Sequence, residues 1–199
     1  MDFEAPIALL APRNRELWVV TARAGSRTGG LIATFVNSAS IVPELPRVLI
    51  GVARQHYTWE LIEASDAFAL NLLGTENLPW IRRFGLQSGR DFDKLAGVKT
   101  ESSVTGSPLL ADALGWLDCR VEARLEIGSR TIYLAEVVDA RIRSHEDPLT
   151  VLQLLCKLPA KESKELGQQM LHDAAVEAEA IRAWRGRQRD GSPRRQSGE

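Results

Sequence analysis

The chain has 199 residues, 44% of them hydrophobic, and a formal net charge of -1 at pH 7. This length is enough for one domain with a sizeable core and further elements at its ends. A charge so close to zero excludes an overall field that would attract nucleic acid or a membrane surface, and no apolar run reaches the ~20 residues of a membrane-spanning helix.

The N-terminal part of the chain predicts three β-strands. Residues 17–22 and 31–37 are short runs of apolar and β-branched side chains, and 48–53 resumes the pattern after two prolines. Between the first two strands, residues 23–30 read Arg-Ala-Gly-Ser-Arg-Thr-Gly-Gly, and we expect a loop that binds phosphate through backbone N–H groups. The third strand runs into a polar segment that begins at Arg54.

A short helix and a fourth strand follow. Thr58 is a suitable N-cap, with Glu60 in the first turn, for a helix that runs to Ala64. The run 68–73 then predicts a strand.

The clearest periodic signal predicts a β-hairpin. Residues 117–127 alternate apolar and charged side chains, the pattern of a half-buried antiparallel strand. Gly128 and Ser129 predict a tight turn, and 130–142 is again rich in β-branched and aromatic residues. The core is therefore expected to be antiparallel β, not a doubly wound parallel sheet.

The character of the chain changes after this hairpin. We expect a domain over 1–147, a helical extension over 148–185 and a disordered tail over 186–199, whose Arg, Gly, Ser, Pro and Gln cannot bury enough apolar surface. The extension predicts a long amphipathic helix whose apolar face packs on the domain or on a second subunit. The residues of that face are Leu166, Met170, Ala174, Ala178, Ile181 and Trp184.

Several side chains could bind a phosphorylated ligand. Arg54 could bind phosphate through two hydrogen bonds, and Lys94 could add a second charge. Each residue alone could equally satisfy a turn or carry an ordinary surface charge. In an extended segment 31–40, one face would comprise Thr34, Val36, Ser38 and Ser40.

Taken in order, these segments resemble the flavin reductase family, whose members hold FMN or FAD in a split antiparallel β-barrel. The resemblance covers roughly residues 5–145 and implies a fold that is mainly β with α, a split barrel followed here by the long C-terminal helix. Its motifs are individually weak, and their order and spacing carry the resemblance. They are 19–22, 30–40, 48–54, 68–73, Phe84-Gly85, Ser88-Gly89-Arg90, Asp93-Lys94 and the hairpin around Gly128.

The resemblance also implies a flavin site. In the family, the segment matching 33–40 contacts the isoalloxazine ring and the ribityl chain, largely through backbone, and the segment matching 53–58 approaches the phosphate. The residues thereby assigned to the flavin are Thr34, Ser38, Ala39, Ser40, Arg54, Thr58 and Lys94.

The hairpin turn departs from the family pattern. Many flavin reductases carry Gly-Asp-His-Thr there, with the histidine close to the flavin and to the incoming nicotinamide, whereas this chain has Gly128-Ser129-Arg130-Thr131. Arg130 can still hold a dinucleotide phosphate or the electron-rich edge of the flavin. The substitution nevertheless weakens the case for NADH as the reductant.

The resemblance implies two alternative functions. The first is a homodimeric NAD(P)H-dependent reductase of FMN, or alternatively FAD, which supplies a partner monooxygenase or an electron-transfer protein. The second is a flavoredoxin-type FMN electron carrier without direct NAD(P)H turnover, which Arg130 favours. A cofactor-free β-domain that acts through its C-terminal helix is a third alternative.

The remaining residues support no other chemistry. His56, His145 and His172 lack metal spacing, no GxGxxG follows a strand, and Cys119 and Cys156 form no CxxC. We expect His56 to lie in a solvated loop and both cysteines to be small core residues. With no secretion signal, we expect a cytoplasmic protein.

Overall fold

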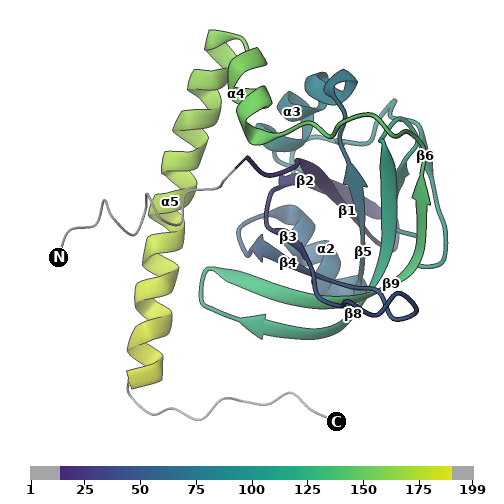
Figure 1. Ribbon diagram of the computed structural model, residues 1–199. Helices are drawn as coiled ribbons and strands as arrows, with labels where there is room; N and C mark the ends of the chain where they lie inside the picture. The colour runs from purple at the N-terminus through teal and green to yellow at the C-terminus, as the bar shows by residue number, and fades with distance from the viewer. Residues whose placement is uncertain (1–13, 190–199) are drawn as a thin grey trace.

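The computed structural model describes residues 14–189, and Figure 1 shows a curled sheet with a long helix beside it. The sheet has seven strands in the order β2-β1-β5-β8-β9-β4-β3, and each neighbouring pair is antiparallel. This confirms the predicted split-barrel architecture. The strands are β1 (Trp18–Ala24), β2 (Arg27–Ala33), β3 (Val36–Ser38), β4 (Arg47–Ala53), β5 (Ala67–Leu72), β8 (Gly115–Glu126) and β9 (Arg130–Ile142), with β6 (Thr100–Glu101) and β7 (Leu109–Leu110) paired separately. The helices are α2 (Tyr57–Ser65), the 3-10 turn η1 (Thr75–Asn77), α3 (Leu78–Gly85), α4 (Val151–Lys157) and α5 (Ala160–Arg189).

The connection between β2 and β3 makes the sheet curl. These two strands form opposite edges of the sheet, yet only Thr34 and Phe35 separate them along the chain. Because one residue spans at most about 3.6 Å, the two edges must lie close together. The amide of Gly51 in β4 donates to the carbonyl of Phe35 at 3.3 Å, which anchors this link on the barrel.

Residues 23–30 form the β1–β2 hairpin, so the prediction of a phosphate-binding loop there is wrong. The strands pair up to the turn, where Gly25 has a φ of 61°. At Gly29 and Gly30, a Cβ would lie 3.0 Å from a side chain of α2 and of α3, respectively. These two glycines therefore permit close packing of helices on a strand and do not mark a loop.

The segment 31–40 is broken in two, so the predicted extended face of hydroxyls is wrong. β2 ends at Ala33, and β3 begins at Val36 on the other edge of the sheet. The chain passes from one edge to the other through Thr34, which therefore does not share a strand with Ser38.

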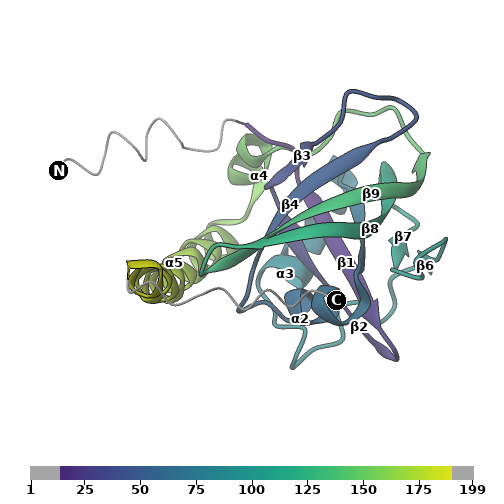
Figure 2. The same ribbon diagram turned by 90° about the horizontal axis from the view of Figure 1, so that it is seen from below.

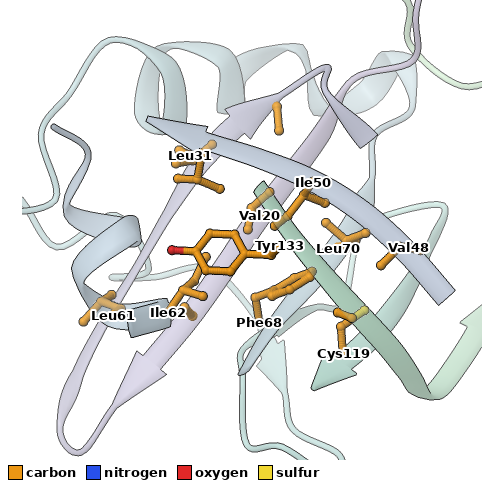
Figure 3. Packing of buried hydrophobic residues seen from close by; sticks show 14 residues of the cluster. Val20, Leu31, Val48, Ile50, Leu61, Ile62, Phe68, Leu70, Cys119 and Tyr133 are labelled. Carbon is orange, nitrogen blue, oxygen red and sulfur yellow. The ribbon is translucent and has the colours of Figure 1, made fainter. Parts of the chain in front are cut away.

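The barrel interior is filled by fully buried apolar side chains. Figure 3 shows the Tyr133 ring among them, next to Val20 and Phe68, all three with 0% exposure. The Tyr133 hydroxyl donates to a carboxylate oxygen of Glu63 in α2 at 2.7 Å. Burial raises the pKa of Tyr133 well above its usual value, so it remains a hydrogen-bond donor that joins α2 to the barrel.

The β8–β9 hairpin is confirmed, but only the first half of β8 faces the core. Cys119 is fully buried and Val121 is partly buried. The strand register shifts between Val121 and Ala123, and Leu125 beyond it is 50% exposed. In β9 the half next to the turn is the buried one, since it carries Tyr133. The turn of the hairpin points towards α5, as Figure 1 shows.

The C-terminal extension consists of α4 and α5. Figure 2, in which α5 is seen almost end-on, places this helix beside the tip of the β8–β9 hairpin. α5 continues to Arg189, beyond the predicted end of the helix, while residues 190–199 of the predicted tail lie outside the described residues. Cys156 in α4 is exposed, which corrects its prediction as a core residue. Among the helices of residues 14–189, none carries an apolar stretch long enough to cross a membrane.

α5 meets the domain with only part of its predicted apolar face. Leu166, Ile181 and Trp184 are half-buried against the rest of the protein. Met170 and Ala174 are exposed, so they do not pack on the domain that carries them.

Candidate functional site

Arg54 stands at the end of β4, where it is both held and accessible. Its backbone N–H donates to the carbonyl of Ser129 at 3.0 Å, and its guanidinium lies 5.1 Å from the ring centroid of Trp59. The guanidinium is also 3.6 Å from the carboxylate of Glu126, and the Arg54 side chain is 42% exposed. A stacked guanidinium that still meets solvent can accept an anionic ligand.

Thr58 lies inside the first turn of α2, so the prediction that it is the N-cap is wrong. The helix begins at Tyr57 with His56 as its N-cap, and Thr58 is only 2% exposed. The first turn of a helix has unpaired N–H groups and the positive end of the helix dipole. The β4–α2 loop, residues 54–56, together with the first turn of α2 therefore suits an anion.

The hydroxyls after β3 bond to their own loop. Ser38 donates to the carbonyl of Ser40 at 3.0 Å, and the Ser40 hydroxyl accepts from the N–H of Val42 at 3.0 Å. The N–H of Ala39 donates to the carbonyl of Arg47 at 2.8 Å. These bonds give the hydroxyls the turn-forming role that was the alternative to ligand binding.

Ser38 and Arg54, two of the predicted site residues, lie at opposite ends of β4. Ser38 pairs with Val48 at the start of the strand, Phe35 bonds to Gly51 in its middle, and Arg54 follows its end. The six-residue step from Val48 to Arg54 corresponds to roughly 20 Å of extended chain. Only an elongated ligand with an anionic end could touch both ends of this strand.

Lys94 is a buried ammonium group, not a surface charge. It is 6% exposed, and its Nζ donates to the carbonyls of Gly30 at 2.9 Å and Phe84 at 3.0 Å. Burial lowers the pKa of Lys94 to about 8. The side chain therefore joins β2 to the end of α3, and its contact with a flavin stays a prediction.

The segment that carries Lys94 lies against the β4–α2 loop. Arg90 donates to the carbonyl of Gln55 at 2.9 Å and forms an ion pair of 2.5 Å with Glu60. The structure thus brings together two segments that are more than thirty residues apart and that both belong to the predicted site.

α5 adds two carboxylates that the sequence did not single out. Glu177 accepts two hydrogen bonds from Arg130, at 2.8 Å from Nε and 2.5 Å from Nη2, and Asp173 accepts from Nε2 of Gln55 at 2.9 Å. Acidic residues four positions apart share one face of a helix. The spacing of Asp173 and Glu177 was the only sequence signal that they act together, and it does not show which face of the helix turns towards the barrel.

His56 lies among these charges and is half-buried, so the prediction of a solvated loop histidine is wrong. Burial lowers its pKa below the ordinary value of 6.5, and the positive charges of Lys94 and Arg130 act in the same direction. Asp173 and Glu177 oppose this shift. His56 is therefore neutral at pH 7, with one ring nitrogen that donates and one that accepts.

Other kinds of site find little support among the described residues. Within residues 14–189, no cluster of three histidine, cysteine or acidic side chains could hold a metal ion. A cavity of about 270 Å³ is lined by residues that include Glu101, Trp116 and Arg141, at the opposite end of the β8–β9 hairpin from its turn. It contains no predicted site residue.

Comparisons with known proteins point to flavin chemistry. The family model described as flavin reductase like domain matches residues 14–154. The high molecular weight rubredoxin of Moorella thermoacetica is 32% identical over 136 residues, which cover 67% of this chain and 58% of that protein. Diflavin flavoprotein A 1 of Synechocystis is 33% identical over 131 residues, covering 65% of this chain and 22% of that protein. The chain therefore spans less than two thirds of the length of either relative.

A solved structure gives the same indication. The NADH:FAD oxidoreductase of Streptomyces globisporus C-1027 has a TM-score of 0.66 and 26% identity, over 75% of this chain and 90% of that one. All predicted flavin residues and Arg130 lie within 14–154, whereas α5 lies outside the segment that the family model matches.

Proposed function

The chain belongs to the family of flavin reductase-like domains, and from this membership we propose that it binds FMN along β4 and transfers hydride from NADH or NADPH to the flavin. FAD is the alternative flavin. One observation carries the proposal: Ser38 and Arg54 lie at opposite ends of one strand, with polar side chains at one end and a guanidinium beside a helix N-terminus at the other.

The β4–α2 loop is the proposed phosphate end of the site. Arg54 is held by the Trp59 ring but remains exposed enough to bind phosphate oxygens. The first N–H groups of α2 offer neutral donors at the same place, whereas the side chain of Thr58 is buried and its contact with the phosphate rests on the family resemblance alone. This set of donors fits a doubly charged phosphate.

The start of β4 and the β3 loop form the proposed ring end. The ring of Phe35 is 42% exposed, and a Cβ at Gly51 would lie only 2.8 Å from it, so the glycine lets the aromatic ring lie on the strand. Ser38 and Ser40 add polar groups beside this apolar surface. An apolar wall with a polar edge fits the isoalloxazine ring, with Thr34 between the two ends.

The chemistry requires little of the protein beyond positioning. Bound FMN supplies the acceptor for hydride from a reduced nicotinamide. The residues of this chain need only hold the two rings together and exclude competing ligands. We assign no general acid or base.

A flavoredoxin-type electron carrier is the second candidate function. Arg130 is the side chain that could hold a nicotinamide phosphate at the hairpin turn, but it already forms two bonds with Glu177. An arginine neutralised in this way attracts a dinucleotide less strongly. This ion pair favours a protein electron donor over NAD(P)H.

We also propose that the protein is a homodimer that serves a monooxygenase or an electron-transfer protein. Large apolar side chains are exposed on the β3–β4 loop and on α4, namely Ile41 (99%), Leu45 (64%), Leu152 (56%) and Leu155 (54%). Ile41 and Leu45 lie on one element and Leu152 and Leu155 on another, and each pair is typical of a surface that another protein covers.

Titration of the protein with FMN and assay with NADH and NADPH test these alternatives. Quenching of FMN fluorescence together with NAD(P)H oxidation that requires flavin would support the reductase. FMN binding without NAD(P)H oxidation would support the carrier. A protein that binds neither FMN nor FAD would contradict both.

A further inference from the structure

α5 places two negative charges on the loop proposed to bind the flavin phosphate. We call Asp173 and Glu177 the acidic pair. Asp173 contacts Gln55 in the β4–α2 loop, and Glu177 contacts Arg130, whose strand position is paired with Ala53 just before that loop. The acidic pair therefore lies beside the residues expected to meet a dianion.

The acidic pair is held in place by the fold. A Cβ at Gly128 would lie 2.6 Å from the Cβ of Trp184 and 3.1 Å from the carbonyl of Ala180, so the backbone of α5 lies directly on the hairpin turn. Glu177 stands less than two turns before Trp184, and its side chain is only 15% exposed. The carboxylates therefore cannot easily swing into solvent when a phosphate approaches.

The two carboxylates differ in what neutralises them. Asp173 accepts from the neutral amides of Gln55 and Gln169, so it keeps its full negative charge beside the loop. Glu177 instead cancels the positive charge of Arg130. Either effect makes the loop less attractive to a phosphate, because like charges repel at short range and neutralised cations do not attract.

We propose that the acidic pair weakens the binding of the FMN phosphate, so that α5 sets how tightly this protein holds its flavin. The proposal rests on the proposed function, since it presupposes a flavin whose phosphate lies at the β4–α2 loop. It assigns a role to α5, which lies outside the segment shared with the family model.

Binding of FMN and of riboflavin to the full chain tests the proposal, because riboflavin lacks only the phosphate. We expect Asp173→Asn to lower the dissociation constant of FMN about tenfold and Glu177→Gln to lower it severalfold, with riboflavin binding unchanged. The matched control is Glu179→Gln, which removes an exposed charge of the same helix and should change neither constant.

The outcomes separate failure of the proposal from failure of the proposed function. If FMN binds but neither variant tightens it, or if riboflavin tightens equally, the acidic pair does not act on the phosphate and the proposal is overturned. If neither ligand binds the wild-type protein, the proposed function itself fails. A variant that misfolds loses affinity for both ligands, so tighter binding of FMN alone cannot arise from misfolding. If Glu177→Gln does misfold, the result for Asp173→Asn decides, because that variant leaves Arg130 paired.

Discussion

The barrel and α5 are held in place by different forces. In the barrel, buried apolar side chains from six strands and α2 surround Tyr133 and Phe68. In α5, by contrast, none of the thirty described residues is buried, and the helix meets the barrel through half-buried side chains and polar contacts such as Arg130–Glu177 and Gln55–Asp173. The difference separates a part that is specified by hydrophobic burial from a part that is specified by a few individual contacts.

Substitutions in the barrel should therefore lower stability strongly, whereas most substitutions in α5 should change it little. Large-to-small changes in a packed interior lose both transfer free energy and packing, whereas changes on an exposed helix surface are close to neutral. Contacts between the two parts should have intermediate effects, and these are the ones through which α5 acts on the site.

The largest effect is expected for Phe68→Ala in the barrel. Phe68 is 0% exposed, so we expect a loss of about 3–5 kcal/mol in the free energy of unfolding. Leu171→Ala in α5, where the side chain is 74% exposed, should change stability by less than about 0.5 kcal/mol. Denaturant titrations of both variants check this, and equal losses would break the comparison.

The next effect is a pH dependence due to Lys94. Its pKa of about 8 in the folded protein lies below the value of about 10.4 in an unfolded chain, so the unfolded chain binds more protons between these two values. Stability should therefore rise by up to about 3 kcal/mol as the pH increases through this range, while the full penalty is present below pH 8. Unfolding titrations of wild type and Lys94→Met, with Lys99→Met as the exposed control, measure this rise; it should vanish in Lys94→Met alone.

Arg54→Ala probes the barrel's side of the site. Loss of a charge-assisted hydrogen bond should weaken FMN binding by about 1–3 kcal/mol. Arg143→Ala is the control, since Arg143 pairs with Glu101 and lies in no segment assigned to the flavin. Fluorescence titration gives both constants, and an unchanged dissociation constant for Arg54→Ala would remove that residue from the site.

The joint between the two parts should show an intermediate loss of stability, smaller than that of Phe68→Ala and larger than that of Leu171→Ala. Gly128 has a φ of 90° and no room for a Cβ beside Trp184, so Gly128→Ala should destabilise the protein by about 1–2 kcal/mol and loosen α5. Gly167→Ala in α5, where a Cβ would meet nothing within 4 Å, should instead leave α5 in place and favour the helix. Limited proteolysis of α5 compares the two variants, and equal cleavage would show that the hairpin turn does not hold the helix.

Most barrel strands could be predicted from the sequence because burial of a strand requires apolar side chains in a run or in alternation. The β9 strand was predicted with its observed bounds, and the run 48–53 falls within β4. The β1–β2 hairpin was missed because Gly29 and Gly30 resemble loop residues, while their true cause is the approach of α2 and α3. Close packing between distant segments leaves no local pattern.

The residues that surround the site could be predicted only in part, because the helical periodicity of α5 does not show which face of the helix contacts the barrel. Arg54 and Lys94 were both assigned to the flavin, so their segments were expected to lie close together. The structure places the Ser88–Lys94 segment against the β4–α2 loop. The orientation of α5 was not predictable, because periodicity favoured Met170 as an inward residue, whereas Asp173 is the one that meets Gln55. Specific polar partners on a distant hairpin and loop decided which face turned inward.

The Thr34–Phe35 link has a consequence for the shape of the surface along β4 that is proposed to bind the flavin. Three consecutive peptide steps join Ala33 of one sheet edge to Val36 of the other, which limits their separation to about 11 Å. The sheet cannot flatten beyond that limit, so the curvature along which an extended ligand would lie is preorganised by chain connectivity. A ligand bound there does not have to supply the free energy for bending the sheet.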